Sequence, residues 1–469
     1  MKLTVKNFGP IQKATVDIKP MTVFVGHSNT GKSYLAILIY ITAKVLESPF
    51  SVLDITRIND DLSDKTVADE KELAKFVNTK FLDFVNTIHR RWENEALRCF
   101  GEEWKEMINK NGGSTSIIVS SNDKKITLDM LSPNKDKFSL KNPILQNVKK
   151  KISPLSKRDS VDYFDIARLV VSEGCSLFNS LLTASEKKKD SNYLRRRYIS
   201  EGFNTHYLPA VRGGLMQSHR ILVSALVDRA PTIGLTGAEI IPFTGVLADF
   251  LQKLLNVHAI QRRKPKAENI SELSQTIEQD IMHGNIEVKM LATRYPDFRY
   301  KFKDRDVGQR NISLMNASSS VSELAPIALF IRYYLSPGDI FIVEEPEAHL
   351  HPEAQRVIAG ILVELVNAGV YVIATTHSDI ILEQISNFVH ADKFPNSKVL
   401  NKRVKNLTLQ KNKIGTYGFK RSKNGNGTIV NRISFNKETG ILTKDHLDVS
   451  SDLYNETVDL FNQREINDA

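Results

Sequence analysis

Eight consecutive residues near the start of the chain form a pattern that binds phosphate. Residues 26–33 have the sequence GHSNTGKS and match G-x-x-x-x-G-K-[ST]. In such a loop the backbone N–H groups turn toward phosphate oxygens, the lysine neutralises their charge and the last hydroxyl binds Mg²⁺. We therefore expect ATP and Mg²⁺ at this loop, with Ser33 as a metal ligand. The expected ATP ligands are Gly26, His27, Ser28, Asn29, Thr30, Gly31, Lys32 and Ser33.

A pair of glutamates follows an apolar stretch in the second half of the chain. Residues 340–343 are all apolar, which is typical of a buried strand, and Glu344 and Glu345 come directly after them. Ligands collect at the carboxyl ends of strands in open α/β sheets. We expect Glu344 to bind the metal and Glu345 to act as the base that deprotonates a water molecule. His349 and His351 leave a zinc site open as a competing hypothesis.

Two further groups are placed to meet the γ-phosphate of ATP. His377 follows the apolar residues 370–374, so we expect it at the tip of the next strand, within hydrogen-bonding reach of that phosphate. Ser320 and Glu323 have the spacing of a reciprocal capping box at a helix start. The hydroxyls and N–H groups of this helix start can also bind a γ-phosphate across a dimer interface. The serines concerned are Ser318, Ser319 and Ser320.

These residues fall at the ends of expected strands and helices. Near the N-terminus, alternating and apolar stretches predict strands, and the residues after the glycine loop predict a helix. Later, helices and apolar strands alternate, which is typical of a parallel sheet with crossover helices. The predicted fold class is α/β with a P-loop. The expected strands are 2–8, 14–18, 21–25, 340–343 and 370–374, and the helices are 32–45, 321–334, 352–367 and one from 380.

The segment between the N-terminal strands and helix and the later alternating elements differs from both in its composition. Its lysine-rich sequence predicts mostly helix, so we interpret it as an insertion into the ATPase. The predicted domains are an N-terminal lobe (1–46), the insertion (47–204), a C-terminal lobe (205–392) and a basic β/helix extension (393–469). Further expected helices are 69–88, 92–109, 244–256, 270–282 and 453–462, and strand character is expected at 117–119, 126–128, 298–302 and 427–435.

The composition limits the class of protein. The chain has 469 residues, of which 41% are hydrophobic and 25% charged, as in globular proteins with more than one domain. No stretch is apolar enough to span a membrane, and the two cysteines, Cys99 and Cys175, predict a reducing compartment, so we expect a cytoplasmic protein. The formal net charge is +10, and residues 393–437 contain no Asp or Glu. This basic segment predicts contact with DNA or with an acidic protein.

In this order the motifs resemble those of the ATP-binding-cassette (ABC) ATPases of the RecF, SMC and OLD group. The resemblance implies an ABC-type head with a mixed central sheet, which pairs with a second head around two ATP molecules. Lys32, Glu345 and His377 would then act in hydrolysis within a homodimer or a higher oligomer. The phrases that carry the likeness are residues 5–11, 26–33 (Walker A), 207–212, 318–320 (signature start), 344–352 (Walker B) and 375–378 (switch histidine).

The chain departs from this group at three places. Glu344 stands where many relatives have Asp, and Ser320 stands where glycine is common. The glutamine of the Q-loop is not assigned, and Arg212 and Gln217 are the candidates for that position.

The pattern also resembles ATPase subunits of bacterial antiphage systems such as Septu and PARIS, which act beside a separate nuclease. The leading hypothesis is an ATP-gated switch that controls a nuclease or another effector in nucleic-acid metabolism or antiphage defence. The alternative is a self-contained OLD-like DNA nuclease and ATPase, with its nuclease hidden in the insertion. A membrane transporter subunit is disfavoured by the missing L-S-G-G-Q motif. A scaffold that binds ATP without hydrolysis is disfavoured by the presence of both acids.

Overall fold

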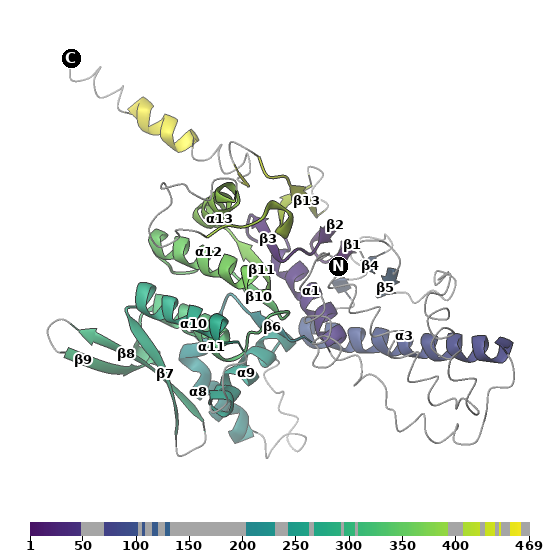
Figure 1. The fold of residues 1–469 in the computed structure, drawn as a ribbon, viewed down its shortest axis with the longest axis horizontal. Helices are drawn as coiled ribbons and strands as arrows, with labels where there is room; N and C mark the ends of the chain where they lie inside the picture. The colour runs from purple at the N-terminus through teal and green to yellow at the C-terminus, as the bar shows by residue number, and fades with distance from the viewer. Residues whose placement is uncertain are drawn as a thin grey trace.

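A ten-stranded mixed sheet forms the centre of the molecule, and a separate three-stranded antiparallel sheet lies at one side (Figure 1). The structure is a computed structural model. It describes residues 1–47, 70–101, 106–107, 115–120, 127–131, 203–229, 243–261, 267–291, 295–304, 308–392, 407–422, 427–436, 440–441 and 451–460. The predicted mixed α/β class is confirmed.

Four parallel strands make up one half of the central sheet. They run in the order β3 (Met21–Gly26), β11 (Tyr371–Thr376), β10 (Ile340–Glu344) and β6 (Thr205–Leu208). Each pairs in parallel with the next. Nearly every residue of these strands is buried, because helices cover both faces of this half. The glycine loop after β3 and the acids after β10 therefore lie at the same edge, separated by one strand.

The other half of the sheet joins distant parts of the chain. It runs in the order β12 (Ile414–Arg421), β13 (Thr428–Ile433), β2 (Ile11–Asp17), β1 (Lys2–Phe8), β4 (Ser116–Ser120) and β5 (Thr127–Asp129), and β12 pairs in parallel with β3. The hairpin expected in the insertion thus extends the same sheet, and β12 is a strand that the sequence did not predict. The four-part domain division stays a prediction, and the sheet is continuous across its boundaries at residues 46 and 392.

Helices cover the two faces of the sheet and bury two hydrophobic cores. One core lies under α1 (Lys32–Glu47) and α3 (Glu70–Phe100). The other lies under α11 (Ser319–Tyr333), α12 (Pro352–Asn367) and α13 (Asp379–Ala391).

The helix α3 corrects the sequence analysis. Instead of separate helices at 69–88 and 92–109, residues 70–100 form one helix of 31 residues, part of which reaches well beyond the sheet in Figure 1. Of the expected residues 102–109, only 106–107 are described, and they are helical. The helix ends at Phe100, where Gly101 takes a left-handed backbone (φ +70°), a common way to stop a helix.

The remaining described elements include the neighbours of α11 and elements of the C-terminal part of the chain. They are α8 (Arg212–Arg229), α9 (Gly245–Gln261), α10 (Glu268–Thr276), a π-helical turn at Ile277–Ile281, β7 (Gly284–Met290), β8 (Pro296–Asp304), β9 (Gly308–Ser313), 3-10 turns at Leu314–Asn316 and Lys411–Lys413, and a helix at 451–460. The helix expected at 270–282 therefore changes into a π-helical turn before its end. Among the described helices, none combines the length and the apolar character needed to cross a bilayer.

Candidate nucleotide site

The glycine loop is shaped by close packing around its two glycines. Gly26 has φ +146°, and a Cβ atom there would lie 2.5 Å from the carbonyl oxygen of Phe419 on β12. Gly31 has φ +94°, which side-chain-bearing residues rarely adopt. Lys32 folds back over the loop, and its ammonium donates to the carbonyls of Gly26 and His27, each at 2.8 Å. These contacts fix a curled loop at the N-terminus of α1.

The outer surface of this loop is open to solvent. His27, Ser28, Asn29 and Ser33 are exposed, whereas Thr30, Gly31 and Lys32 are buried. The Thr30 hydroxyl donates to the His27 carbonyl at 2.7 Å and closes the turn. The exposed part of the loop and the Ser33 hydroxyl are therefore accessible to a phosphate group.

Glu344 is the last residue of β10, and only one of its two carboxylate oxygens accepts a hydrogen bond from a described residue. Its residue is 7% exposed, and Oε2 accepts a hydrogen bond from the Ala210 backbone N–H at 3.1 Å. Oε1 is buried and has no hydrogen-bond partner in the part of the chain that the structure describes. A buried carboxylate oxygen and a serine hydroxyl are oxygen ligands of the kind that Mg²⁺ takes. The chemistry of Glu344 and Ser33 therefore fits a magnesium ion.

Glu345 adopts an unusual backbone conformation. Its φ is +43°, its N–H donates to the Thr375 carbonyl at 2.9 Å, and its side chain is 42% exposed. Glu345 Oε1 lies 3.6 Å from Nε2 of His377. The structure thus brings the predicted base and the predicted switch histidine together at the ends of β10 and β11.

Glu347 and Thr376 lie next to His377. The sequence suggested a contact with a partner subunit for Glu347 and no role for Thr376. Glu347 Oε1 accepts from the Thr376 hydroxyl and from the backbone N–H of His377, both at 2.7 Å. Burial raises the pKa of Glu347, and these hydrogen bonds oppose that effect. Glu347 thereby fixes the backbone from which the His377 side chain projects. Its position within residues 344–352 was the available signal.

The charges around Lys32 connect the loop with the acids. Burial lowers the pKa of Lys32 to about 8, and the opposing influences are the negative charges of Glu345, Glu347 and Glu344, in that order. The lysine on the β3 side and the acids on the β10 side therefore share one electrostatic environment across β11.

The start of α11 differs from the expected capping box. Ser318 is the N-cap, and its side chain makes no capping hydrogen bond. The Ser318 and Ser320 hydroxyls lie 3.1 Å apart at the surface. Glu323 does not reach back to the helix start, because its carboxylate pairs with Arg212 at 3.2 Å. The capping-box prediction was wrong, and Ser318 and Ser319 remain exposed.

The two Q-loop candidates both face inward. Arg212 is 0% exposed and contacts protein carbonyls, which excludes a direct contact with a solvent-exposed ligand in this conformation. Gln217 donates to the Ser322 hydroxyl at 3.0 Å.

The two histidines after the acids, His349 and His351, have different surroundings. His349 has φ +58° and is exposed, and His351 caps α12 by accepting from the Glu353 N–H at 3.3 Å. Within the described ranges, no group of three or more His, Cys, Asp and Glu side chains is arranged to hold a metal ion.

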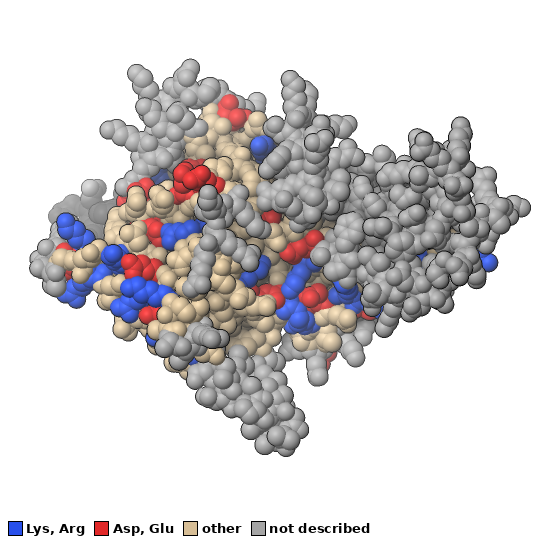
Figure 2. Space-filling model, turned by 60° about the horizontal axis from the view of Figure 1, so that its bottom comes forward, with Lys and Arg blue, Asp and Glu red and all other residues tan. Residues whose placement is uncertain are grey.

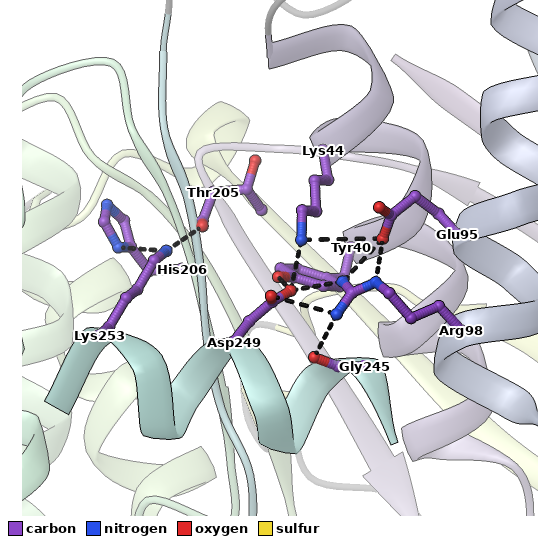
Figure 3. A network of polar contacts seen from close by, with 9 residues as sticks. All are labelled: Tyr40, Lys44, Glu95, Arg98, Thr205, His206, Gly245, Asp249 and Lys253. Atoms are coloured by element: carbon purple, nitrogen blue, oxygen red, sulfur yellow. Dashed lines mark hydrogen bonds and ion pairs between the residues drawn. The ribbon is translucent and has the colours of Figure 1, made fainter. Parts of the chain in front are cut away.

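A polar network anchors the far end of the loop helix α1 (Figure 3). Asp249 of α9 accepts from Lys44 at 2.5 Å and from Arg98 at 2.6 Å, and it also accepts from the Tyr40 hydroxyl. Glu95 of α3 contacts the same Arg98 at 2.7 Å. The helix that carries Lys32 at its start is therefore fastened to α3 and α9 near its end.

Comparison with known proteins identifies the family. The model of the AAA ATPase domain matches residues 1–196 and 244–382, which together are more than half of the chain. The chain belongs to the AAA ATPase domain family. Members of this family bind nucleotide, so the loop, Glu344 and Glu345 are its candidate nucleotide site. No curated protein matches the chain.

Several solved structures are similar to this AAA ATPase chain. A SmcHead bound to the C-winged helix domain of ScpA has 11% identity and a TM-score of 0.35, with 93% of this chain and 98% of that chain covered. The SMC head domain from Thermotoga maritima has 10% identity, coverage of 92% and 98%, and a TM-score of 0.34. The third structure is an Smc head domain with an extended coiled coil, bound to the C-terminal domain of ScpA derived from Pyrococcus furiosus. It has 12% identity and a TM-score of 0.35, with 97% of this chain and 98% of that chain covered.

Proposed function

We propose that this AAA ATPase is a switch that binds ATP with Mg²⁺ and hydrolyses the γ-phosphate bond. The observation that supports this most is the meeting of three parallel strands at one edge. β3 leads to Lys32, β11 leads to His377, and β10 leads to Glu344 and Glu345. A cation, a histidine and two acids at one end of a sheet are the parts that phosphoryl transfer to water needs.

Each side chain has a distinct role in this proposal. The loop N–H groups and Lys32 bind the phosphates, and Glu345, whose carboxylate is open to solvent, orients a water molecule and accepts its proton. His377, 3.6 Å from Glu345, contacts the γ-phosphate and senses its loss. Glu344 and Ser33 hold Mg²⁺, which when bound neutralises charge on the β- and γ-phosphates.

We further propose that ATP closes a homodimer. Ser318, Ser319 and Ser320 lie at the exposed start of a 15-residue helix, whose N–H groups and partial positive charge suit an anion. These serines would bind the γ-phosphate held by the partner molecule. Hydrolysis would then release the two molecules, and the cycle would control a separate effector such as a nuclease, in nucleic-acid metabolism or antiphage defence in the cytoplasm.

DNA contact through residues 393–437 stays a prediction. Of this basic segment, 393–406, 423–426 and 437 lie outside the described residues. The rest includes β12 and β13, and the exposed basic residues among it are Lys411, Lys420, Arg421 and Arg432. Elsewhere, on the side of Figure 2 that holds the three-stranded sheet, blue and red side chains lie next to each other. Lys289 and Lys301 both pair there with Glu287, at 3.4 Å each.

The experiment is an ATP binding and hydrolysis assay on two variants. Lys32→Ala should lose ATP affinity, whereas Lys13→Ala, an exposed lysine on β2, should not. Glu345→Gln should keep its ATP affinity, hydrolyse about 10²–10⁴-fold more slowly, and accumulate an ATP-dependent dimer by light scattering. Normal turnover in Glu345→Gln would remove Glu345 from its role. ATP-dependent cleavage of plasmid DNA by the purified chain would favour the self-contained nuclease instead.

A further inference from the structure

Directly behind the two acids lies a buried guanidinium. Arg212 begins α8 and is 0% exposed. Its NH1 donates to the Glu344 carbonyl at 2.5 Å, and its NH2 donates to the Glu345 carbonyl at 2.9 Å. Burial lowers the pKa of Arg212, and the surrounding carboxylates, Glu323 first among them, oppose this effect. A buried cation in such a place is costly unless its donors are used, and here they point at the backbone of the acids.

These contacts control the conformation of Glu345. A non-glycine residue with φ +43° is unfavourable by itself and persists only where neighbours hold it. The Glu345 N–H is held by the Thr375 carbonyl, and its own carbonyl is held by Arg212. The direction of the Glu345 side chain therefore depends on where the guanidinium lies.

The other side of the same guanidinium contacts α11. Arg212 Nε donates to the Glu323 backbone carbonyl at 3.2 Å and pairs with the Glu323 carboxylate at 3.2 Å. Glu323 is 6% exposed and lies about one turn into the helix that starts with the three serines. Because a guanidinium is planar and rigid, a shift of α11 moves the donors that hold the acids.

We propose that Arg212 is a positioning residue that makes hydrolysis depend on the position of α11. When the start of α11 binds a γ-phosphate, Glu323 carries the shift to Arg212, and Arg212 carries it to the backbone of Glu345. This inference rests on the proposed ATPase function and adds a route by which one end of α11 reports to the catalytic base. Arg212 itself touches neither substrate nor metal.

Two neighbouring glycines provide a matched test. A Cβ at Gly213 would lie 2.4 Å from Glu323 Oε1, so Gly213→Ala displaces that carboxylate, which is the end of a movable side chain. A Cβ at Gly214 would meet nothing within 4 Å, so Gly214→Ala is the control. We expect Gly213→Ala to lower kcat about tenfold to a hundredfold, with the Kd for ATP within twofold of the unmodified chain. Gly214→Ala should change neither.

A second variant, Arg212→Lys, removes the planar set of guanidinium N–H donors but keeps the positive charge. Arg212→Lys cannot donate to Glu344, Glu345 and Glu323 at the same time, so its kcat should fall while its Kd for ATP stays unchanged. If Arg212→Lys does not fold, the glycine pair decides alone. Equal kcat values for Gly213→Ala and Gly214→Ala would overturn the inference about Arg212. The proposed ATPase function would still stand if the wild-type chain hydrolyses ATP. Absent ATP hydrolysis by the wild-type chain would overturn both.

Discussion

The left-handed backbone of Glu345 is a strained position that serves the geometry of the site. Aspartate, asparagine and glycine tolerate this conformation, and β-branched residues do so poorly. The chain nevertheless places a glutamate there and holds it through the Thr375 carbonyl and Arg212. The proposed chemistry favours a glutamate at position 345, whereas the left-handed backbone conformation of this position disfavours one.

This conflict predicts different stabilities for two inactive variants. Glu345→Asn and Glu345→Val both lack the carboxylate, so both should lose ATP hydrolysis. Because φ is +43°, the valine variant should be less stable than the asparagine variant by about 1–2 kcal/mol. Urea unfolding of the two proteins measures the difference. Equal midpoints and slopes would show that position 345 is not held in the left-handed region.

Glu47, at the end of α1, predicts a pH dependence of stability. Burial raises the pKa of Glu47 from 4.5 to about 7, against the opposing influence of Lys253 and Lys44. The folded chain therefore binds this proton more tightly than the unfolded chain does. The resulting stability is complete below pH 4.5 and is lost as the pH rises to 7, by a total on the order of 3 kcal/mol.

The measurement compares the chain with Glu47→Gln, which resembles the protonated side chain at every pH. The difference in unfolding free energy between the two proteins should grow in favour of the variant between pH 5 and pH 7.5. A difference that does not vary with pH would show that folding does not raise the pKa of Glu47.

At the scale of elements, the nucleotide loop depends on how α1 is held. Asp249 is the shared acceptor of Tyr40, Lys44 and Arg98, so it ties α1 to α3 and α9 (Figure 3). The Trp92 ring N–H of α3 adds a buried hydrogen bond to the Thr42 hydroxyl at 3.1 Å. The long helix α3 is therefore fastened directly to the helix that carries Lys32.

Removal of the shared acceptor should be costly. Asp249→Ala leaves Lys44 and Arg98 partly buried without their main carboxylate, and we expect a loss of about 2–4 kcal/mol in unfolding free energy. Gln252→Ala, an exposed position on the same helix, is the control and should stay within about 0.5 kcal/mol. Thermal and urea unfolding measure both. A loss in Asp249→Ala no larger than in the control would contradict the anchoring role.

The sequence predicted the local parts of the site and missed the long-range ones. The glycine loop and the two acids are contiguous motifs, and each lies directly after an apolar strand, so the residue pattern and the apolar stretches before it were enough to locate them. β12 escaped because Gly415, Gly418 and flanking lysines interrupt its apolar residues, and its partner β3 lies far away in sequence. The contact between Arg212 and Glu323 likewise needs tertiary structure, although the 207–212 phrase marked the arginine.

At the scale of the whole molecule, the C-terminal part of the chain divides into two kinds of segment. Residues 414–433 form two strands inside the central sheet, between β3 and β2. The helix at 451–460 is exposed at nearly every residue, including Leu453 at 59% and Tyr454 at 70%. The first segment therefore belongs to the folded core, whereas the second has little contact with it.

Two truncations test this division. A chain ending at residue 406 loses β12 and β13, which leaves β3 and β2 with one neighbouring strand each and splits the central sheet, and it should fail to fold into a soluble, cooperative unit. Of the residues that the structure describes, a chain ending at residue 441 loses only the exposed helix at 451–460, and it should keep the melting temperature of the full chain. Circular dichroism melts of both proteins provide the comparison. A stable product from the first truncation would contradict the sheet order.

The contact between Phe419 and Gly26 also orders events in time. A ribosome releases the glycine loop long before it releases β12, the strand whose carbonyl abuts that loop, because the two are far apart in the sequence. Nascent chains that have not yet reached β12 therefore carry the complete phosphate-binding motif without the strand that packs against it. Such chains should capture nucleotide poorly, so ATP binding should begin only after β12 has joined the sheet.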